Sequence, residues 1–147
     1  MEYISNIDDI QSHQLIFKMP VKNQNNKYLY YYKMLYSDTI MHLKYLLFKI
    51  NFNHSFMNHP FKVNKKDPIF DKIRQLECMI LRSINQTVQK EIKCNIYDEL
   101  MQRDITYVVN NNPCFQPLFL KISGIWEDAT HIGIVYKLYY SMNTKSL

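Results

Sequence analysis

The sequence predicts one α+β domain, mainly β with an inserted helix, built as a small five-stranded barrel whose helix lies between the third and fourth strands. Three observations favour this class. Segments rich in aromatic and branched residues, which are typical of strands, stand on both sides of one stretch with helical periodicity. The 147 residues have the length of one domain, and a 47% hydrophobic composition can fill its core. Both glycines of the chain fall in one C-terminal segment, where they allow a strongly curved sheet.

The N-terminal third of the chain predicts three strands. Residues 15–21 (LIFKMPV) and 27–36 (KYLYYYKMLY) form the first two, joined as a hairpin by the polar turn NQNN. Residues 39–52 (TIMHLKYLLFKINF) show both strand alternation and the helical spacing of Leu43, Leu46 and Ile50. We expect a strand in the second half of this segment, followed by a connecting loop up to residue 66.

The start of the predicted helix is well marked. Asp67 stands at the N-cap position, Pro68 follows at the first helical position, and Asp71 falls in the first turn, near the positive end of the helix dipole. Apolar residues then recur every three or four positions, at Ile69, Ile73, Leu76, Ile80 and Ile84. This pattern predicts a helix over residues 68–86 with one face in the core.

The C-terminal part predicts a second short helix over residues 96–104 and a short strand over residues 105–109. After a turn-rich break at residues 110–117, residues 118–126 and 132–140 predict a hairpin. Alternation divides the last strand into two faces. One face carries Ile132, Ile134, Tyr136, Leu138 and Tyr140, and the other carries Gly133, Val135, Lys137 and Tyr139.

Gly124 and Gly133 flank this hairpin, and Trp126 lies between them. A glycine inside a strand marks a bend, a bulge or a close approach of another group to the backbone. Two interpretations stay open. The glycines let the sheet curve while Trp126 fills the core, or they clear space beside a ring on which a nucleobase stacks. We expect Trp126 to support a binding groove rather than to contact the ligand.

The hairpin has the form K-I-x-G-I-W, an acidic turn and G-I-x-Y-K, carried by Lys121, Ile122, Gly124, Ile125, Trp126, Gly133, Tyr136 and Lys137. It resembles the C-terminal strand pair of single-stranded-DNA-binding proteins of nucleocytoplasmic large DNA viruses and related AT-rich linear replicons, over about twenty of the 147 residues. The resemblance implies an OB-fold or OB-like barrel. It also implies a role in viral or plasmid DNA replication, recombination or repair. The partners that we expect besides single-stranded DNA are replication proteins and a second copy of the chain.

The net charge of +5 comes from the N-terminal part, because residues 1–66 hold nine lysines against four acids. Basic surfaces attract polyanions, and twelve tyrosines supply rings on which bases can stack. We therefore predict a nucleic-acid-binding surface formed by Lys18, Lys22, Lys27, Tyr31, Lys33, Lys44, Lys49, Lys137 and Tyr139. Trp126 and Tyr136 are predicted to stack on bases or to support the groove.

Three cysteines, Cys78, Cys94 and Cys114, are odd in number and far apart in the sequence, which predicts buried free thiols rather than a disulfide framework or a metal site. Lys44 and Lys49 interrupt the longest apolar stretch, and the first ten residues lack the pattern of a secretory signal. We expect an intracellular protein, in the host cytoplasm or nucleus if it is viral, that does not enter a membrane. One domain covers residues 1–147, with disordered segments at 1–13 and 141–147.

The sequence carries no P-loop, no G-x-S-x-G, no HExxH and no glycine-rich dinucleotide turn. Asp98, Glu99 and Asp104 could be imagined as the metal ligands of a nuclease, but we interpret them as a solvated helix face. We therefore predict no enzyme, no cofactor and no metal. The predicted function is single-stranded-DNA binding through cationic and base-stacking contacts. One alternative is a minor virion structural or scaffold protein, and a further one is a factor that binds double-stranded DNA.

Overall fold

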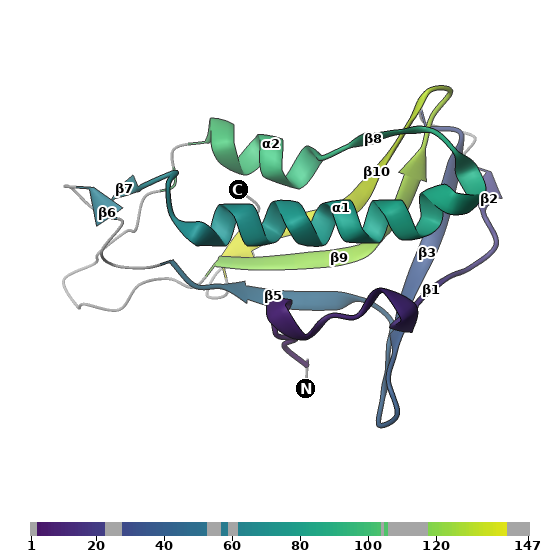
Figure 1. The fold of residues 1–147 in the computed structure, drawn as a ribbon, viewed down its shortest axis with the longest axis horizontal. Helices are drawn as coiled ribbons and strands as arrows, with labels where there is room; N and C mark the ends of the chain where they lie inside the picture. The colour runs from purple at the N-terminus through teal and green to yellow at the C-terminus, as the bar shows by residue number, and fades with distance from the viewer. Residues whose placement is uncertain are drawn as a thin grey trace.

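The computed structural model describes residues 3–22, 28–52, 57–58, 62–103, 105 and 118–140. These residues form a curled, mixed β-sheet with two helices, α1 (Pro68–Val88) and α2 (Asn95–Gln102). Figure 1 shows α1 lying across the sheet with α2 beside it. The fold is therefore of the predicted α+β class.

The centre of the sheet is the predicted C-terminal hairpin, β9 (Leu118–Glu127) and β10 (His131–Tyr140). The other edge of β9 is shared by two strands. β5 (Leu46–Ile50) pairs with its first half, and β3 (Tyr30–Ser37) pairs with its second half. β8 (Glu91–Lys93) pairs with the start of β10 in the parallel sense, which makes the sheet mixed.

Three further short strands pair with β3. β1 (Leu15–Phe17), β2 (Val21–Lys22) and β4 (His42–Leu43) all pair with it in the antiparallel sense. The predicted N-terminal hairpin is thus present, with its first strand split in two around Pro20, which has no N–H to donate to a ladder. Within the described residues the main sheet has eight strands where the sequence predicted five. β6 (Met57–Asn58) and β7 (Lys62–Val63) form a separate two-stranded sheet.

α1 begins where the sequence predicted. The Asp67 carboxylate accepts a hydrogen bond from the Ile69 N–H at 3.0 Å, and Pro68 is the first helical residue. The helix ends before Gln89, whose φ of 55° is left-handed. Of the two helices in the described residues, neither is long and apolar enough to cross a membrane.

α2 confirms the predicted second helix, and its N-terminus is capped by a side chain of α1. Cys94, at the N-cap position, makes no capping hydrogen bond with its side chain. The fully buried Glu77 carboxylate instead accepts hydrogen bonds from the Ile96 N–H at 2.9 Å and the Tyr97 N–H at 3.1 Å. Burial raises the pKa of the Glu77 carboxyl to about 7. These bonds fix the start of α2 against α1.

The core lies between the helices and one face of the sheet. Ile132, Ile134 and Leu138 of β10 are buried there, which confirms the alternation predicted for this strand. Residues 1–13 were predicted to be disordered, but residues 3–13 are described: they contain the 3-10 helix η1 (Ile7–Asp9) and the start of η2 (Ser12–Gln14), and they place Ile10 in the core. Apart from Ile105, the strand predicted at 105–109, the turn at 110–117 and the tail at 141–147 lie outside the described residues.

Candidate nucleic-acid interface

The sheet face turned away from the core, here called the outer face, is defined by strand register. Residues paired across antiparallel strands point to the same side of a sheet, and neighbours along a strand point to opposite sides. Leu118, Leu120 and Ile122 of β9 belong to the buried core. Phe119 and Lys121, which alternate with them, therefore lie on the outer face.

A β-bulge keeps the two halves of β9 in phase. Val135 of β10 pairs with Gly124, after which the register shifts and leaves Ser123 as the extra residue of β9. One extra residue reverses the alternation, so Lys121 and Gly124 lie on the same side although they are three positions apart. Trp126, two residues further on, shares that side. The bulge therefore gives the hairpin one continuous outer face.

Four lysines lie on this face, namely Lys33, Lys49, Lys121 and Lys137. Lys121 and Lys137 are direct cross-strand partners, an arrangement in which like charges destabilise a sheet. Within the described residues of β3, β5, β9 and β10, no Asp or Glu shares the outer face, since Glu127 pairs with Ile132 on the core side. The positive charge of the outer face is therefore not balanced by acids of its own strands.

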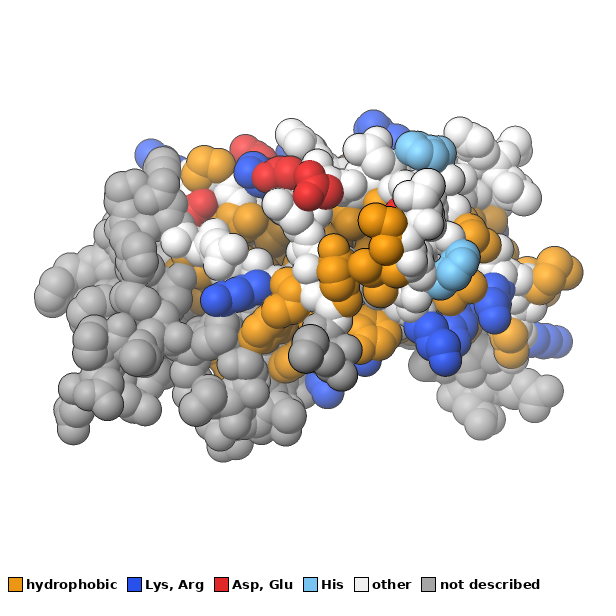
Figure 2. Space-filling model, turned by 90° about the horizontal axis from the view of Figure 1, so that it is seen from below, with side chains coloured by type: hydrophobic (Ala, Val, Ile, Leu, Met, Phe, Trp, Pro, Cys, Tyr) orange, Lys and Arg blue, Asp and Glu red, His pale blue; other side chains and the backbone are white. Residues whose placement is uncertain are grey.

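Figure 2 shows the molecule from the side on which β5 lies, below the view of Figure 1. The acidic side chains visible in this view gather in its upper part. Lys and Arg side chains lie in both the upper and the lower part, and in the lower part they stand among hydrophobic side chains without a visible acid.

Aromatic rings lie between the lysines of the outer face. Phe119 and Tyr139 are cross-strand partners whose rings stack, with centroids 5.7 Å apart and 22° between the planes. The Lys121 ammonium lies 4.1 Å from the centroid of the Tyr45 ring, and that of Lys137 lies 5.8 Å from the Tyr139 ring. Such cation–π contacts offset part of the repulsion between the lysines. They also hold each ammonium group next to a flat ring.

The two glycines of the chain make room for two further rings. A Cβ atom at Gly124 would lie 2.7 Å from Cε2 of Tyr31, and one at Gly133 would lie 2.2 Å from Cζ2 of Trp126. Both distances are shorter than any tolerated contact, and neither glycine has a positive φ. At Gly133 the close approach of the indole requires glycine. At Gly124 the nearest atom is the backbone oxygen of Tyr32, at 2.4 Å, so the neighbouring strand β3 excludes a side chain together with the Tyr31 ring.

Trp126 lies on the outer side of β9 but is covered. Its ring is stacked on that of Tyr28, with centroids 4.6 Å apart, and only 5% of the residue is exposed. That it supports a binding groove stays a prediction. Tyr31 is half-buried, and its hydroxyl donates a hydrogen bond to the Ser123 carbonyl at 3.2 Å.

The outer face brings together six of the residues predicted for the site: Tyr31, Lys33, Lys49, Lys137, Tyr139 and the buried Trp126. Lys18 lies next to this face, because it follows β1 and its backbone N–H donates a hydrogen bond to the Lys33 carbonyl at 2.9 Å. Lys22 is exposed within β2 as the partner of Tyr30, and Lys44 is exposed in the turn before β5. Lys27 lies outside the described residues. The predicted set is therefore only partly a single surface.

Tyr136, predicted to stack on bases or support the groove, lies on the core side of β10. Its hydroxyl donates a hydrogen bond to the Glu99 carboxylate at 2.7 Å. Burial and this carboxylate raise the pKa of Tyr136 above its ordinary value. Its contact is therefore with α2 and not with the outer face.

Four residues of this region, Phe119, Lys121, Tyr28 and Tyr45, were not predicted to belong to the site. The alternation of residues 118–122 alone would have placed Phe119 and Lys121 on one face. No local sequence pattern predicts the contacts of Tyr28 with Trp126 and of Tyr45 with Lys121, because both contacts join segments far apart in the chain.

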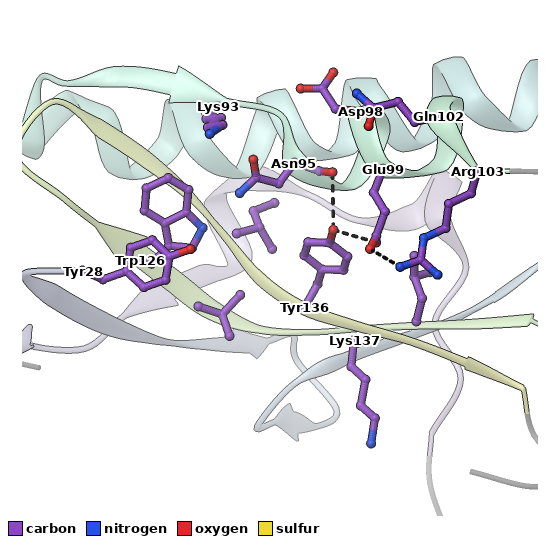
Figure 3. Close-up of a pocket in the computed structure, with 13 residues that line it drawn as sticks. Tyr28, Lys93, Asn95, Asp98, Glu99, Gln102, Arg103, Trp126, Tyr136 and Lys137 are labelled. Carbon is purple, nitrogen blue, oxygen red and sulfur yellow. Dashed lines mark hydrogen bonds and ion pairs between the residues drawn. The ribbon is translucent and has the colours of Figure 1, made fainter. Parts of the chain in front are cut away.

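A hollow of about 820 Å³ lies next to the outer face, between β10 and α2. Figure 3 shows Trp126 and Tyr28 at one end of it, and Lys137 pointing away from α2. Lys93 and Arg103 line the hollow together with acids of α2, and Arg103 forms an ion pair with Glu99 at 3.2 Å. The hollow is therefore of mixed charge, unlike the outer face.

In the described part of the chain, no three His, Cys, Asp or Glu side chains are grouped so that they could hold a metal ion. The comparisons add no relative to this geometry: no protein-family model, no curated protein and no solved structure matches the chain.

Proposed function

We propose that the protein binds single-stranded DNA on the outer face without acting as an enzyme. The observation that carries the proposal is the direct pairing of Lys121 with Lys137 on a face where β3, β5, β9 and β10 place no acid among their described residues. Such a pair costs stability in the free protein. Phosphate groups of a bound strand would neutralise it and release counterions.

The rings of the outer face supply the second element of the proposal. The rings of Phe119, Tyr139 and Tyr45 lie among these lysines. Stacking of a base on such a ring contributes about 1–3 kcal/mol and tolerates any base. Alternating ammonium groups and rings suit a flexible single strand, whose phosphates and unstacked bases are both accessible.

The barrel architecture, the biological role and the partners predicted from the sequence are part of the same proposal. A small OB-like barrel is the architecture that we propose for the curled sheet, with the long β9–β10 hairpin as its last strand pair. The resemblance of residues 121–137 to viral single-stranded-DNA-binding proteins supports a role in replication, recombination or repair. With that role we propose an intracellular, viral setting, replication proteins as partners and a homodimer.

A second candidate function is favoured by exposed apolar residues on the short strands that pair with β3; Val21, for example, is the cross-strand partner of Tyr31. Ile16, Met19, Val21 and Ile40 are exposed by 46%, 85%, 65% and 85% near the β1, β2 and β4 strands. Exposed apolar groups of this kind are typical of contacts between proteins. They support the alternative of a minor virion structural or scaffold protein.

A titration with single-stranded and duplex oligonucleotides of equal length tests the proposal. We expect oligo(dT) to quench tyrosine fluorescence, with affinity that falls steeply between about 50 and 200 mM salt. Tyr139→Leu should weaken this binding several-fold, whereas Tyr30→Leu, a matched change of an exposed tyrosine on the other side of β3, should not. Equal binding of duplex would favour a double-stranded-DNA factor, and absence of binding to either would favour the scaffold protein.

A further inference from the structure

Two cysteines that are distant in the sequence meet where α1 and α2 pack together. Cys78 lies on α1, and Cys94 immediately precedes α2. Their Sγ atoms are 3.5 Å apart, and both residues are half-buried free thiols. A disulfide bond is about 2.0 Å long, so the two sulfur atoms need to approach by only about 1.5 Å to form one. The two thiols are free, as the sequence predicts, but their proximity depends on the packing of α1 against α2 and leaves no sign in the sequence.

Cys78 is accessible from the surface. It lines a hollow of about 590 Å³ on α1, together with Arg74 and Arg82, which stand four residues before and after it on the same helix face. Asp71 also lines this hollow. Two guanidinium groups against one carboxylate favour an anionic reagent at this thiol.

Cys94 lies in a different environment. Burial, the contact with Cys78 and the neighbouring Glu77 carboxyl raise the pKa of the Cys94 thiol to about 12. Thiolates, and not thiols, attack disulfides. The exposed hollow and this raised pKa together assign the first attack to Cys78.

We propose that Cys78 and Cys94 form a reversible disulfide by exchange with a small anionic disulfide of the glutathione type. The Cys78 thiolate attacks one sulfur of the reagent, whose S–S bond breaks, and the released thiolate takes up the proton that Cys78 lost. Cys94 then loses its proton and attacks the Cys78 sulfur, which releases the second half of the reagent as a thiol. The two cysteines give up two electrons, and the reagent is reduced to two thiols.

The disulfide would tie α2 to α1 beside the bonds of Glu77 to Ile96 and Tyr97. Because α2 forms one wall of the hollow next to β10, oxidation would fix that wall in place. This inference concerns the helix side of the molecule and does not depend on DNA binding at the outer face.

Thiol labelling of the full chain in glutathione buffers of graded potential tests the proposal. After acid quenching and transfer to a denaturant at neutral pH, a maleimide should label three cysteines in the reduced protein and one, Cys114, in the oxidised protein. The unlabelled oxidised chain should be lighter by about 2 Da, the mass of two hydrogens. Its melting temperature without reductant should be several degrees higher, because a cross-link of adjacent helices restricts the unfolded chain. Three labels at every potential, or a stable glutathione adduct, would overturn the proposal.

Two single variants separate the roles of the thiols. In Cys94→Ser, a glutathione adduct on Cys78 should accumulate, because the resolving thiol is gone. In Cys78→Ser, adduct formation should be at least several-fold slower, because the remaining Cys94 stays protonated. Equal rates would contradict the assigned order. The labelling of the unaltered chain decides the main point even if a variant does not fold.

Discussion

The rings of Tyr31 and Trp126 lie where two glycines leave room for them. The absence of a methyl group at Gly133 matters most, since a Cβ there would lie 2.2, 2.4 and 2.6 Å from three atoms of the indole. The indole also stacks on the Tyr28 ring. An added methyl group would therefore push the indole away from β10, toward the hollow that Trp126 lines.

We predict that Gly133→Ala lowers the free energy of unfolding by about 1–3 kcal/mol, because the added methyl overpacks a rigid contact. The same change should shift the emission of Trp126, the single tryptophan, to longer wavelength as the ring becomes more exposed. Chemical denaturation followed by fluorescence measures both effects. Thr87→Ala, at an exposed site on α1, serves as the control and should change neither. An unchanged emission in Gly133→Ala would show that the indole is not held against this glycine.

The pairing of Lys121 with Lys137 predicts opposite effects on stability and on binding. Lys137→Gln removes one of two like charges, so the protein should become more stable by about 0.2–0.5 kcal/mol. Its affinity for oligo(dT) should fall, and the slope of log K against log salt should decrease in size by about 0.7. Lys66→Gln, an exposed lysine before α1, should leave the slope unchanged. A lower free energy of unfolding in Lys137→Gln would mean that Lys137 stabilises the folded protein instead.

At the scale of elements, α2 depends on a carboxyl group from another helix. Glu77 is fully buried and bonds two N–H groups at the start of α2, and the pKa of its carboxyl in the folded protein is about 7, above the ordinary value of 4.5. The folded state therefore holds a proton that the unfolded state loses. Stability from this group is complete below about pH 4.5 and is lost as the pH rises through 7.

We predict that the stability of the wild-type protein relative to Glu77→Gln falls by about 2–3 kcal/mol between pH 5 and pH 8. Glutamine keeps one acceptor for the helix N–H groups but does not titrate. Urea unfolding of both proteins at several pH values gives the difference, in which the other titrating groups cancel. A difference that is flat, or that grows with pH, would contradict a raised pKa for Glu77.

The elements differ in how far the sequence predicts them. The start of α1 follows from Asp67 and Pro68, whose capping roles are local, and the alternation of β10 follows from its own residues. The Glu77 cap is not local, since it joins residues about twenty positions apart, and Cys94 gives no cap signal in the sequence. The short strands β4 and β8 owe their existence to partners elsewhere in the sheet.

The candidate site shows the same division. Lys33, Lys49 and Lys137 were predicted because each stands in a recognisable strand. Lys121 lies on the same face as Gly124 only because of the bulge at Ser123, which shifts the alternation of β9 by one residue. A shift of this kind is set by pairing with another strand, and it cannot be read from one segment.

At the scale of the whole molecule, the two sides have different chemistry. The helix side carries Glu77, Asp98 and Glu99 as well as basic residues, whereas the outer face carries lysines and rings. A net charge of +5 alone would attract any polyanion without a preferred side. The central claim is that binding is confined to the outer face.

The most direct test compares two triple variants that remove equal charge. One changes Lys49, Lys121 and Lys137 of the outer face to Gln, and the other changes Lys66, Lys72 and Arg82, which are exposed on or just before α1. The measurement is the salt dependence of oligo(dT) affinity. We predict that the slope of log K against log salt shrinks by about 2 in the first variant and stays at the wild-type value in the second. Equal losses in both, or no salt dependence in the wild-type protein, would contradict a DNA-binding outer face.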